Sequence, residues 1–131
     1  MSTVTDISAA TPEKAIAYFQ QRLSMETDCA DVHSAIVSGE RDFVLLHVVG
    51  SAASFAHCHI PEAFHLPHRL INTASLDRWP RETQFVVYCA GPHCNGADRA
   101  ALKLAQLGRP VKIMIGGIKG WEDEGFAFAT A

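Results

Sequence analysis

Four short runs of apolar residues stand out along the 131-residue chain. Each run is nearly continuous rather than alternating, which is typical of strands buried on both faces of a parallel sheet. Glycine or proline follows each run within two residues, as expected where a strand ends. The predicted strands cover residues 43–49, 63–66, 84–89 and 111–115.

Three other segments carry apolar residues at helical spacing and are predicted to be helices. They cover residues 12–24, 30–38 and 97–107. The first is amphipathic, with Pro12 in its first turn and Thr11 as a candidate N-cap. Asp31 opens the second helix and Gly39 closes it, while Gly108 closes the third.

The third helix lies between two predicted strands, which together form a βαβ unit. This order predicts an α/β fold with a parallel sheet. The length is that of one ordinary domain, which we place at residues 12–131. Residues 1–11 are small and polar, so we expect a flexible N-terminus.

The composition is that of a globular protein, with 48% hydrophobic and 19% charged residues. A formal net charge of −3 offers no attraction to nucleic acid or to anionic lipid. No apolar run approaches the roughly 18 residues that span a bilayer. Residues 1–15 lack the basic start and apolar run of a signal peptide, so we expect a cytoplasmic protein.

Cysteines and histidines are the residues that could bind a metal. The four cysteines, which we expect to be thiols in a reducing compartment, are Cys29, Cys58, Cys89 and Cys94. Histidines gather around the second of them, at His57, His59, His65 and His68. Neither set has the spacing of a standard zinc site, so no metal and no cofactor is expected.

The most informative segment begins where the third predicted strand ends, at Cys89. Ligands of open α/β sheets bind beyond the carboxyl ends of the strands, and a helix start offers unpaired N–H groups and partial positive charge. Both effects predict a lowered pKa for Cys89 and suit a persulfide, whose outer sulfur is negative. The predicted binding loop consists of Ala90, Gly91, His93, Cys94, Asn95 and Gly96. A buried, unreactive Cys89 is the alternative.

Several residues of this segment have two interpretations. Cys94 could resolve or relay a persulfide on Cys89, or it could simply pack under the helix start. His93 could stabilise the thiolate, or it could be an exposed loop residue. Asn95 is a candidate N-cap. Arg99 is a possible auxiliary residue that lends positive charge, unless it is a solvated surface arginine.

Several motifs along the chain resemble those of the rhodanese-like sulfurtransferases, over about residues 25–128. The resemblance is carried by the strand 43–49, His59-Ile60-Pro61, Leu66-Pro67, Tyr88-Cys89, Gly116-Gly117-Ile118, Trp121 and Glu124-Gly125. It implies a three-layer fold, with about five parallel strands between helices on both faces. It also implies that the cysteine matching Cys89 accepts sulfane sulfur. Within the family, Cys-x-Gly-Pro-x-Cys-Asn-Gly-Ala indicates a subtype with a long loop.

The chain departs from the family pattern at several positions. His47 stands where the first strand usually has aspartate, and Cys58 and Glu62 stand where glycine is usual. The usual arginine five residues after the cysteine is absent, which weighs against ordinary thiosulfate activity. The related phosphatases need arginine six residues after their cysteine, where this chain has Asn95, so phosphatase activity is not expected.

The sequence therefore predicts an enzyme, a sulfurtransferase that carries sulfane sulfur as a persulfide on Cys89. Its partners would be a small sulfur donor and a thiol or protein acceptor. The alternative is a non-catalytic rhodanese module that binds a partner or senses redox state through Cys89 and Cys94. The oligomeric state is not predicted.

Overall fold

The computed structural model describes residues 2–131 and contains a sheet of five strands, all of them parallel. The strand order is β1-β5-β4-β2-β3, which puts β4 at the centre. The strands are β1 (Glu26–Asp28), β2 (Val44–His47), β3 (Phe64–His65), β4 (Phe85–Tyr88) and β5 (Val111–Ile115). The predicted α/β class and the parallel sheet are confirmed.

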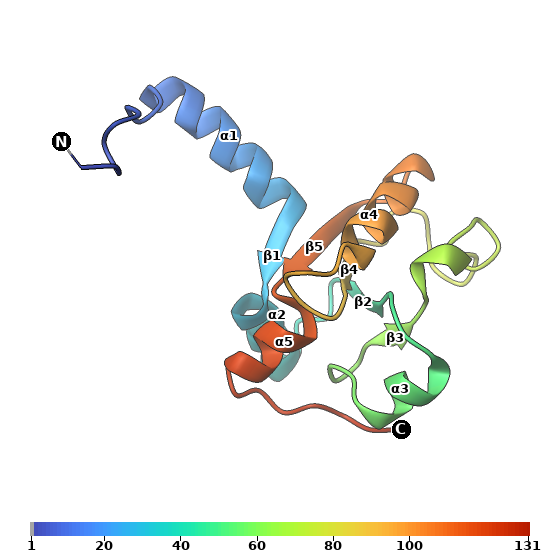
Figure 1. Ribbon diagram of the computed structural model, residues 1–131. Coiled ribbons are helices and arrows are strands. Elements are labelled where there is room, and N and C mark those ends of the chain that lie inside the picture. The colour runs from blue at the N-terminus through green and yellow to red at the C-terminus, as the bar shows by residue number, and fades with distance from the viewer. Residues whose placement is uncertain (1) are drawn as a thin grey trace.

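Helices cover both faces of this sheet (Figure 1). The helices of the chain are α1 (Pro12–Met25), α2 (Cys29–Ser38), α3 (Ala52–His57), the 3-10 helix η1 (His68–Leu70), α4 (Gly96–Gln106) and α5 (Gly117–Asp123), of which α1 projects away from the sheet. Alternate residues of the strands feed two hydrophobic clusters. Leu46 and Val87 pack on the side of α4, whereas Leu45 and Val86 pack with residues of α2 and α5. The result is the three-layer arrangement expected from the resemblance.

The predicted elements differ from the observed ones mainly at their ends. β5 has the predicted bounds, but the other three predicted strands are shorter in the structure than their apolar runs. Val48 shows why, since it is fully buried yet lies beyond the last paired residue of β2. A residue just beyond the end of a strand can be buried without pairing with a neighbouring strand. The hydrophobic pattern alone therefore does not locate the end of the strand. β1, with the polar sequence Glu-Thr-Asp, was not predicted.

The predicted helix starts are confirmed only in part. Thr11 is the N-cap residue of α1, as predicted, but its side chain makes no capping hydrogen bond. Asp28, not Asp31, caps α2, because its Oδ1 accepts from the Asp31 N–H at 2.8 Å. Gly39 closes α2 as predicted, with a left-handed φ of 80°. None of the helices in residues 2–131 has the length and hydropathy to cross a membrane.

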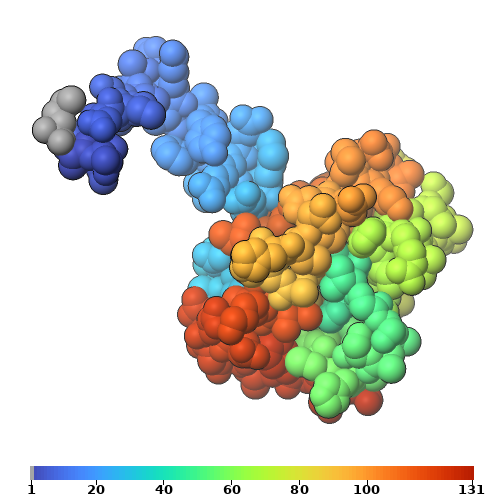
Figure 2. Space-filling view, in the orientation of Figure 1, coloured from blue at the N-terminus to red at the C-terminus, as the bar shows by residue number. Residues whose placement is uncertain are grey.

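Helix α1 projects from the rest of the molecule (Figures 1 and 2). None of its residues is buried, and the apolar side chains of Ile16, Phe19 and Leu23 are 58%, 53% and 70% exposed. Its amphipathic pattern therefore does not mark a face packed on the core. Before α1, the N–H groups of Thr5 and Asp6 donate to the carbonyl of Ser2. Flexibility of residues 1–11 stays a prediction, and residue 1 lies outside the described part of the chain.

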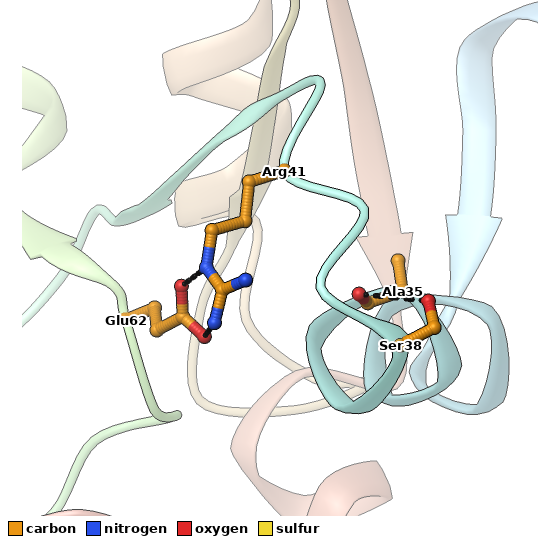
Figure 3. Close-up of polar contacts among 4 residues, drawn as sticks. All are labelled: Ala35, Ser38, Arg41 and Glu62. Atoms are coloured by element: carbon orange, nitrogen blue, oxygen red, sulfur yellow. Dashed lines mark hydrogen bonds and ion pairs between the residues drawn. The ribbon is translucent and has the colours of Figure 1, made fainter.

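Glu62 occupies a position where the family usually has glycine, and the backbone shows why glycine suits it. Its φ is 71°, the one left-handed value at a non-glycine residue in the described chain. The Glu62 carboxylate pairs with both Nε and Nη2 of Arg41, the second contact at 2.7 Å (Figure 3). Nearby, the Ser38 hydroxyl donates to the Ala35 carbonyl at the end of α2 (Figure 3). The pair with Arg41 partly offsets the strained backbone.

Candidate active site at the carboxyl end of β4

Cys89 directly follows the central strand β4, at the carboxyl end of the parallel sheet. Its thiol donates to the main-chain oxygen of Cys94 at 3.2 Å. The N–H groups of Gly91 and Ala97 form hydrogen bonds with the same sulfur. Ala97 lies in the first turn of α4, so the helix start is directed at Cys89, as the sequence predicted.

The acidity of Cys89 differs from the prediction. Cys89 is only 4% exposed and packs in the cluster on the α4 side of the sheet. Burial raises the pKa of Cys89, and the hydrogen bonds from the Ala97 and Gly91 N–H groups do not outweigh it. The neighbouring Cys94 raises that pKa further. The predicted lowering was wrong because it counted the helix start but not desolvation.

Cys94 is the more acidic member of the pair. Its sulfur is partly exposed and accepts from the Gly96 N–H at 3.4 Å. Burial opposes its ionisation, but hydrogen bonds from the N–H groups of Gly96 and Ala90, together with the neighbouring Cys89, outweigh it. The pKa of Cys94 is therefore lowered. Of the two thiols, Cys94 is therefore the one that loses its proton more readily.

Both cysteines line a cavity of about 220 Å³. Its walls come from β1, the loop after β4, α4, β5 and α5, and consist of Glu26, Cys89, Gly91, Pro92, Cys94, Ala97, Asp98, Ile113, Met114, Ile115, Gly116 and Gly117. Glu26 and Asp98 are its two carboxylates, and none of these lining residues is basic. Glu26 and Asp98 were not predicted as site residues. β1 and β4 have their carboxyl ends on the same side of the parallel sheet. The three polar residues of β1 do not form the apolar run from which a strand is predicted.

The start of α5 holds the loop in place. The Ile118 N–H donates to the Cys89 carbonyl and the Lys119 N–H donates to the Ala90 carbonyl, both at 2.9 Å. Gly117, with a φ of 58°, lies so close that a Cβ there would be 3.0 Å from the Gly91 nitrogen. Figure 1 shows this loop beside α5. The N–H groups of Ile118 and Lys119 are therefore bonded to loop carbonyls and are not available to bind an anion.

Three other predicted residues lie away from the cavity. His93 is exposed and does not line it. Asn95 does not cap α4, because its Oδ1 accepts from the Arg99 Nε at 3.1 Å instead. Arg99 is exposed and also outside the lining, so its charge does not replace the missing family arginine. Of the predicted loop, Gly91 and Cys94 line the cavity with Cys89.

Beneath the site, His47 occupies the end of β2 and is 3% exposed. The Tyr88 hydroxyl accepts from the Ile60 N–H at 3.2 Å and shares a second hydrogen bond with His47 Nδ1 at 2.7 Å. Burial, followed by the nearby His65 and His59, lowers the pKa of His47 to about 4. His47 is therefore neutral at pH 7.

The other sulfur near this edge, Cys29, is structural. Its thiol donates to the carbonyls of Ile115 and Gly117, at 3.6 and 3.8 Å. Burial, with Asp28 and Glu124 nearby, raises the pKa of Cys29 to about 11. Across residues 2–131, no three His, Cys, Asp or Glu side chains are grouped so as to hold a metal ion. Cys89 and Cys94 are the two cysteines that line the cavity.

Comparison with known proteins identifies the family. The chain matches the rhodanese-like domain over residues 33–124, and it belongs to that family. No match was found among curated proteins.

Among solved structures, a protein from Bacillus halodurans is 38% identical, with a TM-score of 0.87 over 92% of this chain and 87% of the other. A rhodanese-related protein from Thermoplasma volcanium is 22% identical, with a TM-score of 0.62 over 82% of this chain and 99% of the other. A thiosulfate sulfurtransferase from Pseudomonas aeruginosa is 17% identical, with a TM-score of 0.63 over 85% of this chain but 21% of the other. The last two likenesses show a shared fold.

Proposed function

We propose that this protein is a sulfurtransferase that carries sulfane sulfur as a persulfide on Cys89. The observation that supports the proposal most is the position of that sulfur. It follows the central strand, accepts main-chain hydrogen bonds from Gly91 and Ala97, and lines a cavity of about 220 Å³. Main-chain N–H groups stabilise negative sulfur without a cationic side chain.

The reaction has two steps, each a thiol–disulfide type exchange. First, the Cys89 sulfur attacks the outer sulfur of a donor R–S–SH. The donor S–S bond breaks, a new S–S bond forms on Cys89, and the Cys89 proton leaves with the thiol R–SH. Second, an acceptor thiolate attacks the outer sulfur of the Cys89 persulfide, takes that sulfur, and returns Cys89 as a thiol.

The lining of the cavity favours donors of low charge. Asp98 repels a dianion such as thiosulfate, whereas the Glu26 carboxylate is paired with Arg22 at 3.0 Å, and none of the lining residues is basic. A hydropersulfide carries at most one negative charge, so the cavity repels it less than it repels thiosulfate. We therefore propose a small thiol persulfide as the donor and a thiol, free or on a protein, as the acceptor. The four unpaired cysteines suit the reducing cytoplasm, which we propose as the compartment.

A non-catalytic module that senses redox state through the same two cysteines is the second candidate. Burial is the main cause of the raised pKa of Cys89. Because a protonated thiol reacts slowly with a sulfur donor, this raised pKa favours the non-catalytic candidate. The two candidates differ in one measurable property, which is whether the protein gains a sulfur atom.

The test is intact-mass spectrometry of the reduced protein after exposure to a small thiol persulfide. We expect the earliest spectra after mixing to show a gain of one sulfur atom, which Cys89→Ser abolishes. Cys58→Ser is the matched control, because Cys58 lies at the end of α3 and outside the cavity. The control should label as the wild type does. Equal labelling of Cys89→Ser and wild type would refute the assignment of Cys89.

A further inference from the structure

Cys94 lies beside Cys89 in a way that no part of the two-step transfer uses. The main-chain oxygen of Cys94 is 3.2 Å from the Cys89 sulfur. A Cβ built at Gly96 would lie 3.4 Å from both the Cys89 Cβ and the Cys94 sulfur, so the two side chains flank the same point. The atom nearest to that point is Val49 Cγ1, at 2.5 Å, so glycine at position 96 lets Val49 and the two cysteines pack around it.

The two sulfurs also differ in their burial and in their hydrogen bonds. Cys94 accepts hydrogen bonds from the N–H groups of Gly96 and Ala90 and is partly exposed, whereas Cys89 is buried. These contacts stabilise a thiolate at Cys94. Its attack on Cys89 needs that thiolate beside the inner sulfur, and the outer sulfur of the persulfide would extend into the cavity that both residues line.

We infer that Cys94 is a resolving nucleophile, which reduces the Cys89 persulfide and releases sulfide. This inference rests on the proposed function. The Cys94 thiolate attacks the inner sulfur of Cys89–S–SH, the S–S bond of the persulfide breaks, and the outer sulfur leaves as HS⁻. The new bond is a Cys89–Cys94 disulfide. The sulfane sulfur is reduced by two electrons, the two cysteine sulfurs supply them, and no outside oxidant is needed.

The disulfide must be reduced before the next cycle, which calls for an external dithiol reductant. With such a reductant present, the protein would convert a persulfide donor to its thiol and sulfide repeatedly. Without one, it would stop after a single turnover. This activity goes beyond sulfur transfer to an acceptor, because the sulfur leaves as free sulfide.

The experiment compares wild type, Cys94→Ser and Cys89→Ser, with Cys58→Ser as the control. Each reduced protein receives a small thiol persulfide without oxygen, and both intact mass and released sulfide are followed. After their initial gain of one sulfur atom, wild type and Cys58→Ser should release one equivalent of sulfide and end two hydrogens lighter than the reduced protein. Cys94→Ser should keep one extra sulfur atom, with a persulfide that lasts at least roughly ten times longer, because no thiolate lies beside it. Cys89→Ser should neither hold sulfur nor release sulfide.

The outcomes separate this inference from the function on which it rests. If wild type keeps the extra sulfur as long as Cys94→Ser does, Cys94 does not resolve the persulfide, and sulfur transfer by Cys89 still stands. If the sulfur of wild type is recovered on Cys94, resolution is likewise wrong and Cys94 is a relay. If neither wild type nor Cys94→Ser reacts with the donor, both proposals fail together.

Discussion

Gly117 is the residue on which the shape of the active loop most depends. Its φ of 58° is costly for any other residue, by about 1–2 kcal/mol. A Cβ at this position would also overlap the Cys89 carbonyl and lie 3.0 Å from both the Cys89 carbonyl carbon and the Gly91 nitrogen. Forcing a methyl group against backbone adds about 1–3 kcal/mol. Gly117→Ala should therefore lower the free energy of unfolding by about 2–5 kcal/mol.

Gly125 provides the matched control. Its φ is 78°, so alanine there meets the same backbone cost, but a Cβ would find nothing within 4 Å. Gly125→Ala should cost only about 1–2 kcal/mol. The difference between the two variants isolates the contact with the loop.

The assay is urea unfolding, with the midpoint and slope fitted for both variants and wild type. Sulfur uptake from a thiol persulfide, measured by intact mass, gives the second readout. Gly117→Ala should slow uptake because the Cys89 carbonyl must shift and lose the Ile118 N–H. Gly125→Ala should label at the wild-type rate. If the two substitutions lowered the free energy of unfolding equally, the contact between Gly117 and the loop would not contribute to stability.

Three further predictions concern charge and strain. Because the pKa of His47, at about 4, lies below its unfolded value near 6.5, stability should fall by about 2 kcal/mol between pH 6.5 and 4, and His47→Gln should flatten that slope in unfolding measured at each pH. Asp98→Asn should raise the rate of Cys89 labelling by thiosulfate about fivefold at low salt, with the gain shrinking in 1 M salt; an unchanged rate would contradict repulsion by the lining. Glu62→Gly should raise the free energy of unfolding by about 1 kcal/mol, since it relieves the φ of 71° and loses only an exposed pair; a lower thermal midpoint would show that the pair dominates.

The sequence predicts the central part of this fold well, because burial on both faces of a parallel sheet leaves a continuous apolar run. Phe85–Tyr88 has such a run, is buried at every residue, and lies within the predicted strand 84–89. Glu26–Asp28 has none, because an edge strand of three residues needs only backbone pairing with β5. The predicted sheet therefore lacked β1, and the predicted site lacked Glu26, which lines the cavity.

The acidity of the site was harder to predict than its position. Helix starts are visible in sequence, and Ala97 does direct its N–H at Cys89. Desolvation is not visible, because it depends on packing between segments far apart in the chain. The same holds for Cys94, whose lowered pKa depends on hydrogen bonds from Gly96 and Ala90 that exist only in the folded loop.

The hydrogen bonds from Ile118 and Lys119 to the loop carbonyls join two segments nearly thirty residues apart. Any widening of the entrance, as a bulky protein thiol would require, must break these bonds or carry α5 along with the loop. Exchange of those two amide protons with deuterated solvent therefore measures how often the sulfurs become accessible to large molecules. The last helix of the chain sets that frequency.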